Sequence, residues 1–386
     1  MFTSLILLYE ELYCLFRIQT EKTGNKMKKL SIALGTAAVV AAANGALAGG
    51  YESNALSTSF MYEEVGEYKG FASVSYGSRS YDITGTVYAP TGSAVKDQTS
   101  VNVSLKYGVT DNFAVGFTSY NQGSIQLDYS GAGSAAAAAL PVVDLTIDAR
   151  ALIGKYNVSE NIGFLAGVKQ TVVKDATANI FQSAGLPQST ITGGNELGYI
   201  YGAVYTNDEI AMRVELSVET STDFSLATTN ALAGDGTTTG STPDYINLYL
   251  QSGIAEDTLL YGSIRQANWA ENQLFVHPHG GAATSSFTDS ETYSLGIGRK
   301  LSDSFSASVT LSGEPKGSSA STTPLTITNG YQGITLGGKY TSGNMSISGG
   351  YNYTQLGDVT LTSGLGVGQF TDNTITGFGM KVGFKF

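Results

Sequence analysis

Cysteine, histidine, tryptophan and charge are all scarce in this sequence, and each shortage excludes a class of protein. The 386 residues include one Cys, two His and one Trp. A single cysteine excludes an intramolecular disulfide framework and a cysteine-based zinc cluster. Charged residues make up 14% of the chain, against about 25% in an average soluble domain. The net charge is −11, and because no block of Lys and Arg offsets it, we expect no nucleic-acid partner.

Long apolar runs are also missing. After residue 48 no stretch of about 18 apolar residues occurs, so we expect no transmembrane helix. The chain is rich instead in glycine and aromatics, with 48 Gly, 23 Tyr and 16 Phe, and in Ser and Thr. This composition, poor in helix formers, is typical of a β protein.

The beginning of the chain has the three parts of a bacterial secretory signal. Lys28 and Lys29 form a basic start, and Leu30–Ala43 is short and mostly apolar. Ala46–Ala48 then provides an A-x-A cleavage site. We therefore predict a signal peptide over 27–48, which is too short and wrongly flanked to span a membrane. A buried core helix is the alternative, but it would need neither the lysines nor the cleavage site.

Residues 1–26 lie upstream of this complete signal, either as an over-extended start or as a longer basic region, and do not enter the fold prediction. We expect the mature chain to begin at Gly49. It would then contain no cysteine, because Cys14 is the only one. A cysteine-free secreted chain is compatible with an oxidising compartment.

Apolar and polar residues alternate with a period of two through most of the remaining chain, which is the pattern of β-strands with two different faces. From residue 210 to 219, apolar side chains alternate with Arg213, Glu215 and Glu219. Fourteen segments of this kind are predicted as strands. They are 67–80, 99–108, 113–124, 142–157, 161–174, 196–206, 209–222, 244–255, 258–269, 290–301, 304–314, 331–341, 344–357 and 372–386.

The connections between these segments are alternately short and long. The six short ones contain the turn formers Asn, Asp, Ser and Gly, while the seven long ones are rich in Gly, Ser, Thr and Ala. Tight periplasmic turns, long outer loops and an even strand number are the layout of an outer-membrane barrel. A soluble β-sandwich need not alternate its loop lengths, and a β-helix would show a fixed repeat, which is absent.

We therefore predict an all-β fold, a 14-stranded antiparallel transmembrane β-barrel of the bacterial outer membrane over 67–386, preceded by a short N-terminal hatch at 49–66. Aromatic residues beside the short turns would form the periplasmic girdle. The last strand turns Phe378, Met380 and Phe384 to one face and ends at Phe386. This tail resembles the C-terminal signal that the barrel assembly machinery recognises.

Several stretches resemble the FadL family of outer-membrane channels for long-chain fatty acids and other hydrophobic compounds. They are 49–53, 56–58 and 60–64 near the mature start, 258–265 with Trp269, 293–303, 329–340 and 353–358. The resemblance implies diffusive uptake, in which a substrate rests in a groove between outer loops, enters the barrel and passes an N-terminal hatch. In the best-known members it leaves sideways through the wall. This sequence departs from the family in its short hatch and in lacking the hatch's Asn-Pro-Ala motif.

The predicted lumen face offers candidate ligand contacts. Arg213 and Arg265 are the cations that could pair with a carboxylate in a dry site. Arg265 shares its predicted strand face with Tyr261 and Trp269. The alternative for Arg213 is structural pairing with Glu215 and Glu219. For Arg265, structural pairing and ligand contact stay equally open.

Two outer loops, 175–195 and 223–243, contain Phe181 and Phe224, apolar side chains that need packing or a ligand to leave water. By the family resemblance these are the third and fourth outer loops, which supply the groove, although loop packing alone also accounts for them. His277 and His279 lack a third anchored ligand, so we expect no metal, no cofactor and no enzyme activity.

The sequence thus favours an outer-membrane channel for long-chain fatty acids or other hydrophobic small molecules. Its expected partners are those molecules, outer-membrane lipid, lipopolysaccharide and, during biogenesis, the barrel assembly machinery. A structural or adhesin-type barrel and a general porin are the alternatives. A porin lumen should be lined mainly by charged residues, whereas the predicted lumen mixes Gly, Ser, Thr and Tyr with few charges.

Overall fold

The computed structural model describes residues 46–48, 51–54, 56–87, 89–129, 140–180, 185–317, 320–363 and 366–386. The predicted signal peptide lies outside these residues except for its last three, and it stays a prediction. Within the described ranges, no helix has the length and apolar character needed to cross a membrane.

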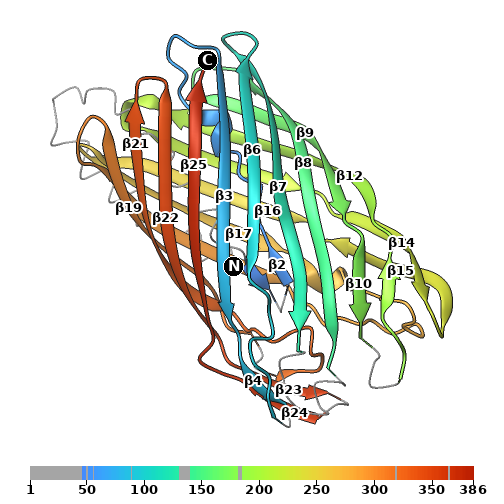
Figure 1. The fold of residues 1–386 in the computed structure, drawn as a ribbon. Helices are drawn as coiled ribbons and strands as arrows, with labels where there is room; N and C mark the ends of the chain where they lie inside the picture. The colour runs from blue at the N-terminus through green and yellow to red at the C-terminus, as the bar shows by residue number, and fades with distance from the viewer. Residues whose placement is uncertain are drawn as a thin grey trace, which may run out of the picture.

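A closed antiparallel barrel dominates the described part of the chain (Figure 1). Its fourteen strands pair in chain order, and the last pairs with the first from Lys385↔Phe71 to Thr374↔Asp82. The strands are β3 (Gly70–Asp82), β6 (Gln98–Gly108), β7 (Phe113–Asp128), β8 (Val142–Asn157), β9 (Ile162–Val173), β12 (Gly194–Asn207), β13 (Met212–Glu219), β16 (Tyr245–Ala255), β17 (Thr258–Ala267), β18 (Ser290–Lys300), β19 (Phe305–Glu314), β21 (Tyr331–Ser342), β22 (Met345–Leu356) and β25 (Thr374–Lys385).

The predicted barrel is therefore confirmed, and each predicted strand overlaps one of the fourteen. β7 continues past its predicted end to Asp128, and β13 is shorter than predicted at both ends, stopping at Glu219 because the chain leaves the barrel wall there. The short turns and the C-terminus lie at one end of the barrel, at the top of Figure 1. Since tight turns mark the periplasmic end of such barrels, we call this end periplasmic and the other end outer.

Apolar side chains cover the outside of the barrel. On β12, Tyr199, Tyr201 and Tyr205 are exposed in a column, and on β25, Phe378 and Phe384 face outward in the same way. Exposed apolar area on this scale is stable only against lipid, so the barrel spans a membrane in the outer-membrane manner. The exposed aromatic residues next to the short turns form the predicted girdle. They include Tyr107, Tyr156, Tyr205, Phe305 and Tyr340.

The long loops at the outer end contain further strands that the sequence patterns did not predict. β10 (Ala176–Asn179) and β11 (Ser189–Ile191) form one pair, and β14 (Thr222–Asn230) and β15 (Gly234–Thr242) form another. A second sheet lies below the barrel in Figure 1. It consists of β4 (Gly85–Val87), β5 (Ala89–Pro90), β20 (Ala320–Ser321), β23 (Val359–Ser363) and β24 (Gly366–Phe370).

A buried apolar core fills the outer end between the wall and these loops. On β8, Val143, Leu145 and Ile147 point into the lumen and are buried, whereas Asp144 and Thr146 alternate with them on the outside. Nearer the periplasm the same strand turns Leu152 and Tyr156 outward toward lipid. The apolar lining of the outer lumen is what positions the candidate site.

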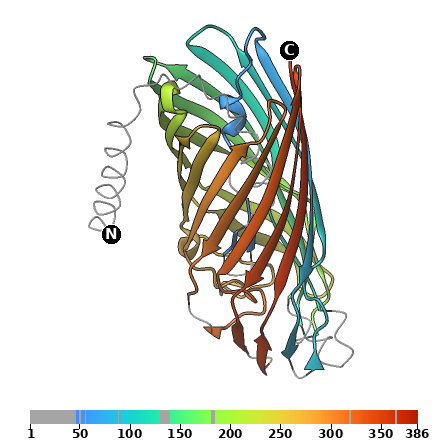
Figure 2. The same ribbon diagram turned by 90° about the vertical axis from the view of Figure 1, so that its left-hand side faces the viewer.

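The segment that precedes the barrel runs through the lumen. β1 (Ala46–Ala48) pairs with β2 (Tyr51–Ser53), and β2 pairs with β7 at Ser124 and Gly123. Residues 54 and 56–64, which we call the plug, then contact inward-facing side chains of many strands and include the 3-10 helix η1 (Ser59–Tyr62). Figure 2 shows this blue segment inside the upper part of the barrel.

Candidate functional site

An apolar cavity lies in the outer lumen, where the ends of β7, β8 and β9 meet the outer loops. It encloses about 50 Å³, enough for a few water-sized groups, so its walls must move slightly to admit a larger molecule. The two aromatic side chains predicted for ligand contact that lie here are Phe224 and Trp269. Other lining residues are Ile125, Val143, Leu145, Ile147, Val173, Ile191, Leu226, Leu274, Val276 and Phe287.

The β14–β15 hairpin supplies one wall of the cavity. Its alternation buries Phe224, Leu226 and Thr228 and exposes the residues between them. The hydroxyl of Thr228 donates a hydrogen bond to the hydroxyl of Thr238 across the hairpin, at 2.8 Å. Because β14 also pairs with β11, the third and fourth outer loops form one continuous wall.

Trp269 reaches the cavity from the fifth outer loop. It begins η5 (Trp269–Glu271), and its ring lies edge-on to Phe287 with 5.5 Å between centroids. The Gln273 side chain holds the loop closed, since its Oε1 accepts from the Phe287 N–H at 2.9 Å and its Nε2 donates to the Phe287 carbonyl at 3.0 Å. The two aromatic rings are therefore fixed before any ligand arrives.

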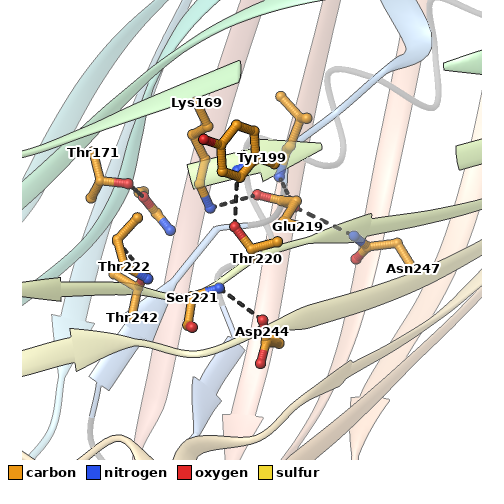
Figure 3. Close-up of polar contacts among 12 residues, drawn as sticks. Lys169, Thr171, Tyr199, Glu219, Thr220, Ser221, Thr222, Thr242, Asp244 and Asn247 are labelled. Atoms are coloured by element: carbon orange, nitrogen blue, oxygen red, sulfur yellow. Dashed lines mark hydrogen bonds and ion pairs between the residues drawn. The ribbon is translucent and has the colours of Figure 1, made fainter. Parts of the chain in front are cut away.

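A layer of charged groups lies next to the cavity, toward the periplasm. The Lys169 ammonium is 3.2 Å from the Glu219 carboxylate, and both side chains are at most 1% exposed (Figure 3). Glu219 also accepts hydrogen bonds from Asn247 at 3.4 Å and from the backbone N–H of Leu56 in the plug at 3.2 Å. This pair thus joins the barrel wall to the plug.

Figure 3 also shows how the chain leaves the wall after Glu219. The Ser221 N–H donates to Asp244 at 2.8 Å, and the hydroxyls of Thr222 and Thr242 lie 2.7 Å apart. These bonds hold the base of the β14–β15 hairpin next to the charged pair, so the apolar wall and the charged layer are fixed relative to each other.

Arg265 is buried in the charged layer and does not line the cavity. Its guanidinium lies 4.2 Å from the centroid of the Tyr245 ring, and it interacts electrostatically with the buried Glu314 carboxylate. Tyr261, on the same strand face, packs against Gly296, and its hydroxyl lies 2.7 Å from that of Thr310. The predicted group of Arg265, Tyr261 and Trp269 is therefore spread over separate surroundings.

Arg213 holds the plug. Its guanidinium is sandwiched at 4.1 Å from the rings of Tyr62 in η1 and Tyr249 on β16. The neighbouring Glu215 accepts a hydrogen bond from the hydroxyl of Thr58 in the plug. These contacts favour the structural alternative for Arg213, although its partners are aromatic rings and not the glutamates considered from sequence.

A cluster of lysines surrounds Glu63 at the periplasmic end of the plug. The Glu63 carboxylate is 3.4 Å from the Lys381 ammonium and 3.7 Å from that of Lys339, while Lys106 donates to the Glu63 carbonyl at 2.8 Å. Burial alone would raise the pKa of Glu63, but Lys381 and Lys339 together lower it below its usual value. The plug is thus fixed at this end by a charged carboxylate.

The barrel wall has a gap between β6 and β7. These strands pair only from Gly108↔Ala114 to Val103↔Ser119 and meet again at the isolated bridge Val95↔Leu127. A β-bulge at Asn121/Gly123 bends β7 in this interval. A polar cavity of about 480 Å³ fills the gap. Its lining includes inward-facing Arg79, Gln98 and Ser100 and outward-facing Asn121, Ser124, Thr146 and Asp148.

No protein-family model matches the sequence. No curated protein sequence matches it either. Among solved structures, that of a Pseudomonas aeruginosa FadL homologue superposes with a TM-score of 0.70 at 12% sequence identity, covering 85% of this chain and 92% of the other. The chain has a FadL-type fold.

The toluene transporter TodX of Pseudomonas putida superposes with a TM-score of 0.58 at 10% identity, covering 82% of this chain and 90% of TodX. A TodX mutant described as a monoaromatic hydrocarbon channel reaches a TM-score of 0.61 at 12% identity, with 90% and 98% covered. At such identities the likeness establishes the fold alone.

Within this FadL-type barrel, the sequence patterns placed six residues at the site. Phe224 and Trp269 line one cavity, Arg265 and Arg213 lie in the charged layer and against the plug, and Tyr261 is hydrogen-bonded to the wall. Phe181 lies outside the described residues. Leu145, Ile147 and Phe287 were missed. Alternation marks Leu145 and Ile147 as one apolar face, but it gives no sign that this face is the lumen.

As expected, most buried polar side chains in the described barrel are Ser, Thr, Asn and Gln, but eight charged ones are buried among them. Buried inside the described barrel are Arg79, Lys169, Arg213, Glu215, Glu219, Arg265, Lys339 and Lys381. They differ from the lining of an open pore because they contact the plug, an aromatic ring or an opposite charge.

Proposed function

We propose that this protein is an outer-membrane channel that admits hydrophobic small molecules by diffusion. The observation that carries the proposal is the apolar cavity between Phe224, Trp269 and Phe287 at the outer end of a membrane-spanning barrel. A concave site lined mainly by apolar and aromatic side chains is the usual form of a small-molecule site, and this one widens when its walls move to admit a ligand. The similarity to a toluene transporter and a FadL homologue supports the same function.

The route that we propose leads from the apolar cavity to the gap between β6 and β7. The axial path meets the plug, which Arg213, Glu219 and the lysines around Glu63 tie to the wall. The gap offers the alternative, because residues of both wall faces line its cavity. A molecule leaving here would enter the membrane sideways, while β2 stays paired along β7.

Long-chain fatty acids are one member of this substrate class, and a neutral hydrocarbon is another. Uptake of labelled hexadecanoate and of labelled para-xylene should therefore be compared in cells that express the protein and in empty-vector cells. We expect uptake above the empty vector for at least one of the two. No uptake of either by a correctly assembled barrel would favour the structural-barrel alternative.

Two variants locate the route within the barrel. Phe224→Ser should weaken capture about tenfold or more, since burying one aromatic side chain against a ligand contributes about 1.5–3 kcal/mol.

Ser100→Trp with Asn121→Trp should fill the gap and slow uptake without changing capture. Leu232→Ser, at an exposed hairpin tip away from the cavity lining, is the matched control and should leave both unchanged. Normal uptake by the filled-gap variant would show that the molecule leaves elsewhere.

A further inference from the structure

The cavity wall contains no cationic side chain among the described residues that line it. Four of its polar members, Thr238, Ser241, Asn272 and Gln273, already have hydrogen-bond partners. Ser241 donates to Asn272 at 2.6 Å, and both ends of the Gln273 amide are used in its own loop. A ligand that enters this cavity therefore meets hydrocarbon walls and no group placed to hold a charge.

The cations of the adjacent layer are committed to other partners. Lys169 pairs with Glu219, and the Arg265 guanidinium lies over the Tyr245 ring and interacts with Glu314. The Lys169 charge is thus matched by the buried Glu219 carboxylate, and the Arg265 charge is held by the Tyr245 ring and by the partly buried Glu314. A carboxylate that reached this layer would have to compete with Glu219 or Glu314 for its cation, in surroundings where an unmatched charge is strongly disfavoured.

The loops around the cavity add negative charge at its entrance. The segments 174–193, 220–244 and 268–289 contain a single Lys or Arg, Lys174, and its ammonium is 2.8 Å from the Asp148 carboxylate. The same segments contain several exposed or partly exposed acids. These are Asp175, Asp223, Asp235, Asp244, Glu271 and Asp289. An approaching anion is therefore repelled before it reaches the apolar wall.

We propose that the cavity selects uncharged hydrophobic molecules and rejects carboxylates of the same shape. This selectivity rests on the proposed channel function and narrows its substrate class, so that hydrocarbons, alcohols and esters enter while ionised fatty acids and benzoates are excluded. Of the two roles that the sequence left open for Arg265, its contacts within the barrel favour structural pairing over contact with a ligand carboxylate.

The single tryptophan of the chain, Trp269, gives a direct test because it lines the cavity. Bromine quenches indole fluorescence at contact, so purified, assembled protein is titrated with para-bromotoluene and with para-bromobenzoate, which differ in a methyl and a carboxylate. We expect saturable quenching by the neutral compound and at least about tenfold weaker binding of the anion. Equal binding of the two would overturn the selectivity and leave the channel function standing. Binding of neither would overturn both.

A charge variant tests the cause. Leu274 lies partly buried at the edge of the cavity, where a lysine can keep its ammonium near water. Leu274→Lys should gain binding of para-bromobenzoate, while Leu274→Met should bind like the wild type. Thr177→Lys, which adds the charge from the third loop, serves if the first variant does not assemble, as judged by heat-modifiable gel mobility. No gain of anion binding in an assembled lysine variant would contradict the proposal.

Discussion

The two halves of this barrel differ in which side of the wall carries the apolar side chains. In the periplasmic half, Leu152 and Tyr156 of β8 face lipid while the lumen contains charges and the plug. In the outer half the same strand turns Leu145 and Ile147 inward and leaves Thr146 outside. A lumen that is sealed by ion pairs at one end can thus hold an apolar cavity at the other.

The halves are also held together by different forces. The outer half is stabilised by burial of apolar surface around Phe224, Trp269 and Phe287, as in the core of a soluble domain. The periplasmic half depends on matched charges, above all Lys169 with Glu219 and Glu63 with Lys381. A charge placed in the apolar half, or one partner removed from an ion pair in the periplasmic half, should therefore destabilise the barrel strongly. The same kind of substitution at a neighbouring position outside these arrangements should have little effect.

The largest effect is expected where a charge enters the apolar half. Leu145→Lys removes the burial of a Leu side chain, about 1.5–3 kcal/mol, and places an unpaired ammonium among apolar side chains at a cost of several kcal/mol more. Thr146→Lys adds the same charge one residue away, outside the wall beside Asp144 and Asp148, and should change stability by no more than about 0.5 kcal/mol. Urea unfolding monitored by heat-modifiable gel mobility measures both. Similar stability of the two variants would show that the outer lumen is not dry.

A smaller but still large effect is expected from removing one partner of an ion pair in the charged layer. Glu219→Leu leaves the Lys169 ammonium buried without its carboxylate, which should destabilise the barrel by about 3–5 kcal/mol. Lys169→Met combined with Glu219→Leu should recover much of this loss, because both charges are then absent. If the double variant is no more stable than the single one, the hydrogen bonds of Glu219 and not its charge pair support the plug.

The smallest effect is expected at the periplasmic end of the plug. Glu63→Gln removes the charge that binds Lys381 and Lys339, and should loosen the plug by about 1–3 kcal/mol. Labelling of Ser57→Cys by a water-soluble maleimide would report the loosening, since the mature chain is expected to lack cysteine. Glu64→Gln, at the exposed neighbouring acid, is the control and should label at the wild-type rate.

Glu63 also makes the attachment of the plug to the barrel wall depend on pH. Because the pKa of Glu63 lies below its usual 4.5 in the folded protein, its contribution is fully present above about pH 4.5 and is lost as the pH falls through the lowered pKa. The plug labelling rate, divided at each pH by the rate for urea-unfolded protein to cancel the titration of the thiol itself, should therefore be flat through neutral pH and rise only in acid, and Glu63→Gln should abolish the rise. A rise near pH 7 would point to another group.

The sequence was sufficient for the barrel because alternation and loop length are local signals. Each predicted strand overlaps a barrel strand, and the inward positions of Arg213, Glu219 and Arg265 follow from their alternation with apolar neighbours. What each residue touches inside the lumen could not be predicted. Arg213 meets Tyr62 only because the plug folds back against β13, a contact between positions far apart in the chain.

The sequence could not predict, for a related reason, that the apolar face of β8 turns inward at the outer end. A face of Val143, Leu145 and Ile147 opposite Asp144 and Asp148 looks like a lipid-facing strand, since alternation does not distinguish lipid from an apolar core. This face becomes a core because the β14–β15 hairpin and the loop that contains Phe287 fold over the outer mouth of the barrel and exclude water from it. The cavity is thus a product of loop packing, which no period-two pattern encodes.

The most direct test of the channel account is a crystal structure of the assembled protein soaked with para-bromotoluene, with the bromine located by its anomalous scattering. The account predicts a bromine peak between Phe224, Trp269 and Phe287, with the plug and its Glu63 contacts unchanged. A peak that lies only outside both this cavity and the gap between β6 and β7, or no peak inside the barrel at a concentration that saturates uptake, would contradict it.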